Sequence, residues 1–159
     1  MSVSSDVSTR VVDGLRRNEA LWECLHRLPA LQLSAWYLGA GCVAQTIWNL
    51  THGKAPSADK RFGYRIQPYQ STEDAIGTWP TTATAIGVRP SGHELEVWAP
   101  FGTDDLFNLV VRPNRVQITP AIYDAKVTRW VAHWPSLEAL SWEEGVGRSG
   151  LRHPDAAIR

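Results

Sequence analysis

The 159-residue chain carries no net charge and little sulfur. Lys plus Arg and Asp plus Glu both number 16, so charge gives no argument for nucleic acid, a membrane surface or an acidic partner. A neutral protein tends to associate, which is compatible with a homodimer. Cys24 and Cys42 are too few and too far apart for a disulfide framework or a paired zinc motif. We therefore expect reduced, buried cysteines.

Long apolar stretches are also missing. The first residues contain no apolar core between a basic end and a cleavage site, so no secretory signal is expected. No apolar run approaches the length that spans a bilayer. These absences predict a soluble, cytoplasmic protein that forms one domain over residues 1–159, with a loose tail at 143–159. In contrast, tryptophan is abundant: the chain has eight, and we expect most of them in the core.

Apolar spacing and turn residues outline a sequence of helices and short strands. We expect one N-terminal helix with Val11, Leu15, Trp22 and Leu25 on one face and a cap at Ser8 or Thr9, ended by Pro29. A buried strand follows within 31–41, then a helix over 43–53 that stops at Gly53. Ser71 caps a short helix, and Thr119 caps a later helix that Pro135 ends.

The segments 83–89 and 93–99 are predicted to form an antiparallel hairpin around Pro90-Ser91-Gly92. The fold class that follows is α/β of the α+β type, with a small mixed sheet and flanking helices.

The strongest local candidate for a site is the turn Gly39-Ala40-Gly41-Cys42. Glycines between a strand and a helix allow close approach of a ligand, and a helix N-terminus offers N–H groups and partial positive charge to a phosphate. A tight turn also needs glycine for steric reasons alone, and this reading is the more frequent one. The residues by themselves leave both readings open.

Carboxylates supply the second candidate. Glu94 and Glu96 point to one face of the predicted strand and so are placed to ligate a metal together, although the solvent face of a hairpin is the simpler reading. Asp104 and Asp105 fit the first turn of a short helix. The five histidines form no pair at metal-ligand spacing.

Four stretches in order resemble a family of bacterial nucleotidyltransferase-like proteins. They are WYLGAGCVAQTIWNLTHG (36–53), PYQSTEDAIGTWPTTATAIGVRP (68–90), LEVWAPFGTDDLFNLVVRPN (95–114) and YDAKVTRWVAHWPSL (123–137), and the resemblance spans roughly 36–142. It implies a nucleotidyltransferase core in which a glycine turn meets the phosphates and acids on strands hold Mg²⁺ or Mn²⁺. The implied reaction transfers a nucleoside monophosphate from an NTP to an acceptor. Carried over by position, Gly39, Ala40 and Gly41 match the turn and Glu96 matches the later-strand acid.

The chain departs from this pattern after His52-Gly53. Relatives have an acid-rich strand, a helix and another strand there, whereas only eight residues, 54–61, precede Phe62 in this chain. Fully extended, they span about 28 Å and cannot hold three elements. Asp59 is the only acid in this gap, so a metal site would have to draw on Asp59, Glu94 and Glu96. A natural deletion, a shortened gene and a sequence with a segment cut out all explain the gap.

These observations leave three functional hypotheses. The first is a nucleotidyltransferase whose activity is weakened by the missing acid pair. The second is a nucleotide or phosphate binder without catalysis, and the third is a domain that binds a partner chain through an open sheet edge. In the first two, only backbone donors and Arg65 or Arg89 are expected to face the phosphates.

Overall fold

The computed structural model describes residues 3–33, 36–56, 69–92, 94–147 and 157–158. Its helices are short, and several connections contain single 3₁₀ turns. The α-helices are α1 (Val3–Arg16), α2 (Glu19–Arg27), α3 (Gly41–Thr51), α4 (Thr72–Gly77), α5 (Asp104–Phe107) and α6 (Pro120–His133). The 3₁₀ turns are Leu28–Leu31, Thr82–Thr84 and Trp142–Glu144.

Two small sheets accompany these helices. Strands β1 (Leu38–Gly39), β2 (Gly87–Ser91), β3 (Glu94–Trp98) and β6 (Ala157–Ile158) form an antiparallel sheet in the order β1-β2-β3-β6. A separate parallel pair joins β4 (Val110–Val111) to β5 (Glu138–Ala139). The α+β class is as predicted, but the parallel and antiparallel pairings lie in two sheets rather than in one mixed sheet.

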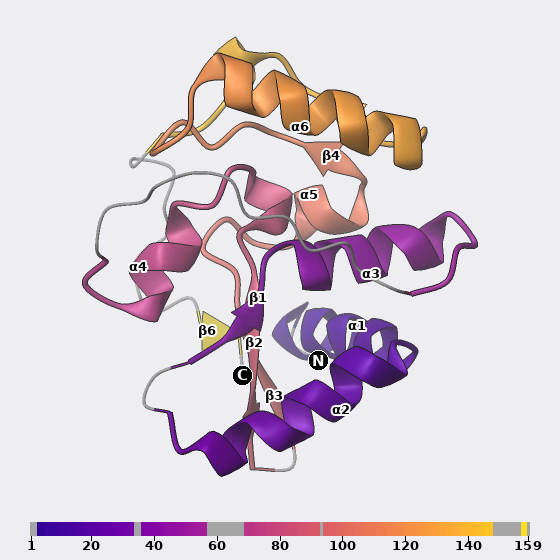
Figure 1. Ribbon diagram of the computed structural model, residues 1–159, viewed down its shortest axis with the longest axis vertical. Coiled ribbons are helices and arrows are strands. Elements are labelled where there is room, and N and C mark those ends of the chain that lie inside the picture. Colours follow the sequence, from indigo (N-terminus) through magenta and orange to yellow (C-terminus); the bar gives the residue numbers. More distant parts are fainter. Residues whose placement is uncertain (1–2, 34–35, 57–68, 93, 148–156, 159) are drawn as a thin grey trace.

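The main sheet has helices on both faces (Figure 1). Helices α1, α2 and α3 lie on one side of it, α4 lies on the other, and α6 lies beyond β4 at one end of the molecule. Leu95 and Val97 point from β3 into the core on the side of α1. Trp98 packs with Ile76 of α4 on the other side, so alternate β3 residues face different layers.

The predicted hairpin is confirmed in its pairing and shifted in its bounds. Its register pairs Gly87 with Trp98 and Ser91 with Glu94, so Pro90 and Ser91 belong to β2 and not to the turn. Residues 82–84 form a 3₁₀ turn, held in part by the hydroxyl contact of Thr84 with Thr81, so the first part of 83–89 is not a strand. Pro90 is tolerated because β1 pairs only as far as Val88, which leaves β2 an edge there.

The N-terminal region forms two helices where the sequence predicted one. Asn18 caps α2 by accepting from the Leu21 N–H at 3.2 Å, and its buried amide donates to Thr46 Oγ1 at 2.8 Å. Ser8 and Thr9 lie inside α1 and therefore do not cap it. The predicted apolar face is nonetheless directed inward, with full burial of Val11, Leu15 and Leu25 and partial burial of Trp22.

The later helices agree with their predicted signals. Helix α3 covers most of 43–53, and Gly53 follows its end with a positive φ of 64°. Ser71 Oγ accepts from the Asp74 N–H at 3.0 Å and caps α4. Thr119 caps α6, which ends at His133. A glycine that tolerates positive φ follows the end of α3, and side-chain hydroxyls cap the starts of α4 and α6.

Tryptophans form the contact between α3 and α6. The ring of Trp48 lies 5.5 Å from that of Trp130 and 5.3 Å from that of Trp134, both in edge-to-face arrangements. Trp134 Nε1 donates to Asn49 Oδ1 at 2.8 Å. The core role predicted for the tryptophans holds for the four buried ones, Trp48, Trp98, Trp130 and Trp134. The other four are partly buried, and Trp22, Trp36, Trp79 and Trp142 pack against the core.

Two further expectations need correction. Both cysteines are free, as predicted, but Cys24 is exposed on the outer side of α2. Val146 bridges to Asn114, and β6 pairs with β3, so parts of the predicted loose tail take part in β-pairing. No helix within the described ranges combines the length and the apolarity needed to cross a membrane.

Candidate functional site

The turn that joins β1 to α3 has an unusual backbone at Ala40. This residue has φ 56° and ψ −134°, a conformation that L-residues with a Cβ rarely adopt. Its N–H donates to Ile86 O at 3.0 Å, while its carbonyl accepts from the Val43 and Ala44 N–H groups at 3.1 Å each. Ala40 is therefore fixed from both sides and sets the direction in which α3 begins.

The two glycines beside Ala40 have different reasons to be glycine. A Cβ on Gly39 would overlap Ile86 O and lie 2.9 Å from Gly87 Cα, so strand packing alone demands glycine there. A Cβ on Gly41 would meet only the end of the Gln45 side chain, with Nε2 at 2.9 Å. Gly41 also lacks a positive φ. The steric explanation therefore accounts for Gly39 and not for Gly41.

The start of α3 suits an anion electrostatically. The helix has 11 residues, and its first turn contains no acidic side chain. The first N–H groups of any helix have no intrahelical acceptor and carry partial positive charge. Cys42 Sγ contacts Gly39 O at 2.7 Å, which places the thiol against the backbone of the turn. Gly39, Ala40, Gly41 and Cys42 thus form one continuous strand-to-helix turn.

A polar cluster lies on the sheet at the other end of β1, beside Tyr37. Arg89 and Glu96 are directly opposite each other on β2 and β3. Arg89 donates from Nε to Glu96 Oε2 and from Nη2 to Glu96 Oε1, each at 3.0 Å. Tyr37 donates its hydroxyl to Glu96 Oε1, and Arg89 Cζ lies 4.5 Å above the Tyr37 ring centroid. Glu96 is therefore held by a guanidinium fork and a phenol.

The protonation of Tyr37 follows from this arrangement. Burial, followed by the hydrogen bond to Glu96 and the negative charge of Glu96, raises the pKa of Tyr37 far above its usual value near 10. Tyr37 is thus a permanent hydrogen-bond donor at neutral pH. Its hydrogen bond and the two hydrogen bonds from Arg89 together hold the Glu96 carboxylate in one orientation.

The described residues do not provide the metal site implied by the family. Both oxygens of Glu96 are engaged by Arg89, and Glu94 is exposed. Nowhere in the described ranges do three or more His, Cys, Asp or Glu residues gather so that they could hold a metal ion. Asp59 falls outside the described residues. The prediction that Asp59, Glu94 and Glu96 hold Mg²⁺ or Mn²⁺ remains a prediction.

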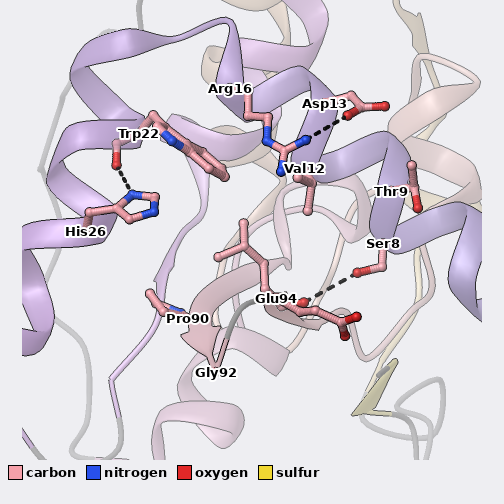
Figure 2. Close-up of a pocket in the computed structure, with 11 residues that line it drawn as sticks. Ser8, Thr9, Val12, Asp13, Arg16, Trp22, His26, Pro90, Gly92 and Glu94 are labelled. Carbon is pink, nitrogen blue, oxygen red and sulfur yellow. Dashed lines mark hydrogen bonds and ion pairs between the residues drawn. The ribbon is translucent and has the colours of Figure 1, made fainter.

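Glu94 borders a different surface from the turn. It lies on a groove of about 560 Å³ between the hairpin and helices α1 and α2 (Figure 2). On the opposite side of the groove, Arg16 lies 3.6 Å from Asp13, and His26 Nδ1 lies 2.8 Å from Trp22 O. Asp13, Arg16 and His26 are therefore each already in contact with a residue of their own helix.

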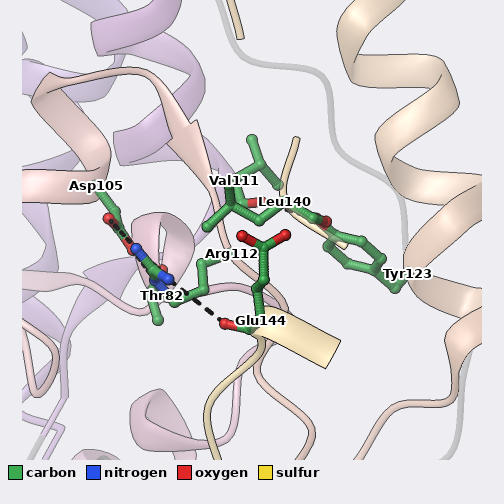
Figure 3. A network of polar contacts seen from close by, with 7 residues as sticks. All are labelled: Thr82, Asp105, Val111, Arg112, Tyr123, Leu140 and Glu144. Carbon is green, nitrogen blue, oxygen red and sulfur yellow. Dashed lines mark hydrogen bonds and ion pairs between the residues drawn. The ribbon is translucent and has the colours of Figure 1, made fainter. Parts of the chain in front are cut away.

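A second ion pair lies between α5 and the residue that follows β4 (Figure 3). Asp105 lies in the first turn of α5, as predicted, and accepts from Arg112 Nε at 3.0 Å and from Thr82 Oγ1. Arg112 also donates to Glu144 O at 3.4 Å. These contacts join the 3₁₀ turn at Thr82–Thr84 to the segments around β4 and Trp142–Glu144. We assign this network to stability.

Sequence reasoning missed the role of Tyr37 in the cluster. It named Arg89 only as a cation facing the phosphates, and it left Glu96 without a partner. The signal lies in the hairpin register, because the pairing of Gly87 with Trp98 places Arg89 opposite Glu96. The position of Tyr37 follows from the pairing of Leu38 with Val88, because the same antiparallel register places Tyr37 beside Arg89.

Comparisons with known proteins agree with this geometry. A family model described as nucleotidyltransferase matches residues 26–62 and 58–139, and the match breaks close to the predicted missing stretch. An NMR structure described as a CCA-adding enzyme head domain has a TM-score of 0.65 and 21% identity, covering 84% of this chain and 95% of that chain. That likeness shows a shared fold. No curated protein matches the chain. Because the family model covers more than half of the chain, this protein belongs to the nucleotidyltransferase family.

Proposed function

We propose that this protein binds a nucleoside triphosphate with its phosphates at the turn formed by Gly39, Ala40, Gly41 and Cys42. The observation that supports this most is the backbone of Ala40, which is strained and yet held by three hydrogen bonds at the start of an 11-residue helix. Strain of this kind persists where the surrounding structure enforces it, and it gathers at ligand sites. The absence of an acid from the first turn of α3 leaves the partial positive charge available to a phosphate.

The family implies a reaction, namely transfer of a nucleoside monophosphate from the NTP to an acceptor. That chemistry uses metals held by carboxylates to neutralise charge on the phosphates. In this chain, Arg89 engages both carboxylate oxygens of Glu96, so Glu96 is not free to hold a metal. The arrangement therefore favours nucleotide binding without efficient transfer. We therefore propose nucleotide binding as the function of the chain, with transfer as the reaction of the family.

Gly41 offers the cleanest test of the binding site. Gly41→Val adds a side chain at the first helical residue, where only the end of Gln45 must move, so the variant should fold. It should weaken ATP or GTP binding, measured by titration calorimetry, by about tenfold or more because it covers helix N–H groups. The matched control is Gly147→Val, since nothing lies within 4 Å of a Cβ at residue 147.

Unchanged ATP affinity in a folded Gly41→Val protein would show that the turn is only structural. If the unmodified protein binds neither ATP nor GTP, nucleotide binding is wrong and the partner-binding hypothesis gains support. Circular dichroism of both glycine variants confirms that they are folded before affinities are compared.

A further inference from the structure

His52 joins the end of α3 to the segment that follows α6. Its Nδ1 lies 2.8 Å from Trp48 O, one turn earlier in α3. Its Nε2 lies 3.2 Å from the backbone nitrogen of Ser136, in the connection between α6 and β5. His52 and Ser136 are 84 residues apart in the chain. One imidazole ring therefore links two segments that only the fold brings together.

The two partners of His52 determine where the imidazole proton lies. Trp48 O is a carbonyl oxygen and can only accept, so Nδ1 must donate to it. The Ser136 N–H can only donate, so Nε2 must be without a proton to accept it. Both hydrogen bonds form together only in the neutral tautomer with its proton on Nδ1. A protonated imidazole has an N–H on both nitrogens, and its Nε2–H would oppose the Ser136 N–H.

The neighbouring contacts between α3 and the end of α6 do not respond to acid in this way. Trp134 Nε1 donates to Asn49 Oδ1 at 2.8 Å, and neither group changes its charge with pH. Lys54 donates its Nζ to His133 O, and an ammonium group keeps its protons in acid. The contact of His52 Nδ1 with Trp48 O also survives, because a cation at a helix C-terminus is favourable. Acid therefore removes one contact and leaves the others in place.

The charges near this contact do not decide its response. In residues 48–56 and 130–140, the other charged or titratable side chains are Lys54, His133 and Glu138. Lys54 disfavours a second positive charge on His52, and Glu138, at the start of β5, favours it. These two effects oppose each other, so the Ser136 N–H is the neighbour that distinguishes the neutral ring from the protonated one.

We propose that His52 is a pH-sensitive clasp, which holds Ser136 while the ring is neutral and releases it when the ring is protonated. Histidine is the side chain whose ordinary range of protonation falls between about pH 5 and 8. The released connection leads from α6 into the parallel pair of β4 and β5, so acid frees this connection from α3. Nucleotide takes no part in the contact, so the clasp does not depend on the proposed binding site.

Nitrogen NMR of the unmodified, ¹⁵N-labelled full chain tests the clasp. At about pH 8, His52 should carry its proton on Nδ1 and none on Nε2. As the pH falls to about 5, the Ser136 amide signal should shift with the same midpoint as the His52 ring. Its protection from hydrogen exchange, relative to the free peptide rate, should fall by about fivefold. The Trp134 indole N–H should keep its protection, because its bond to Asn49 does not titrate.

Two histidine variants separate the clasp from a general effect of acid. His52→Gln should abolish the pH-dependent shift of the Ser136 amide, whereas the matched control His133→Gln should retain it. A proton on His52 Nε2 at about pH 8, or a Ser136 signal that ignores the His52 titration, would overturn the proposal. So would a Ser136 shift that persists in His52→Gln, or loss of Trp134 indole protection together with that of Ser136. The tautomer and the Ser136 shift are read in the unmodified protein, so they decide the question even where a variant does not fold.

Discussion

Replacing Ala40 with glycine should stabilise the protein. The φ of 56° and ψ of −134° at Ala40 are open to glycine, whereas a residue with a Cβ pays about 1–3 kcal/mol of strain there. Glycine costs up to about 1 kcal/mol through the greater freedom of the unfolded chain. The net expectation for Ala40→Gly is a gain of about 0.5–2 kcal/mol in unfolding free energy, which corresponds to roughly 1–8 °C in Tm.

Equilibrium unfolding in urea, followed by tryptophan fluorescence, measures this gain directly. Ala44→Gly is the matched control, since Ala44 is fully buried inside the same helix and its replacement should cost about 1 kcal/mol. The two alanine-to-glycine changes should therefore have opposite signs. A destabilised Ala40→Gly protein would refute the strain argument and remove the main support for a specialised turn.

Three further predictions concern the core, pH and turnover. Asn114→Ala should lower the unfolding free energy by about 2–4 kcal/mol in urea, because the buried amide donates to Gly77 O at 2.8 Å and Trp79 O at 2.9 Å. A loss below about 1 kcal/mol would contradict this. Burial, with smaller effects of nearby acids, raises the pKa of Tyr123 to about 12. Its contribution to stability is therefore full below about pH 10 and is lost by up to about 1.4 kcal/mol per pH unit towards pH 12. In stability measurements across this range, Tyr123→Phe should make the fall shallower, and an equal fall in both proteins would count against the assignment. Pyrophosphate release from NTPs with Mg²⁺ or Mn²⁺ should stay at or near background, because losing one electrostatic partner alone costs about 10²–10³ in rate. Robust metal-dependent release that disappears in Glu96→Gln would show that an acid cluster exists.

Features set by neighbouring residues were predictable from the sequence. Ser71 and Thr119 cap their helices through their own hydroxyls, and Gly53 follows α3 with the positive φ that glycine tolerates. The hairpin pairing followed from alternating apolar residues on both sides of a turn. In each case the deciding interaction lies within a few residues of the chain.

Features that depend on distant residues were not predictable in the same way. Asn18 ends one helix and caps the next because its side chain also bonds Thr46, and the amphipathic pattern continues across the break. The partners of Glu96 depend on a register that shifted once Pro90 and Ser91 joined β2. The second sheet is formed by β4 and β5, whose two-residue strands carry no periodic signal.

The position of β3 has a consequence for the order of assembly. β3 pairs with β2 across a short turn, receives the Ser8 hydroxyl from α1 at Leu95 O, and pairs on its other edge with β6 at Val97 and Trp98. Local hairpins close within microseconds, whereas contacts between distant segments wait for the intervening chain to fold. During synthesis, the β3 edge therefore stays open until residues 157–158 have left the ribosome. An open strand edge favours edge-to-edge aggregation, so this interval carries that risk.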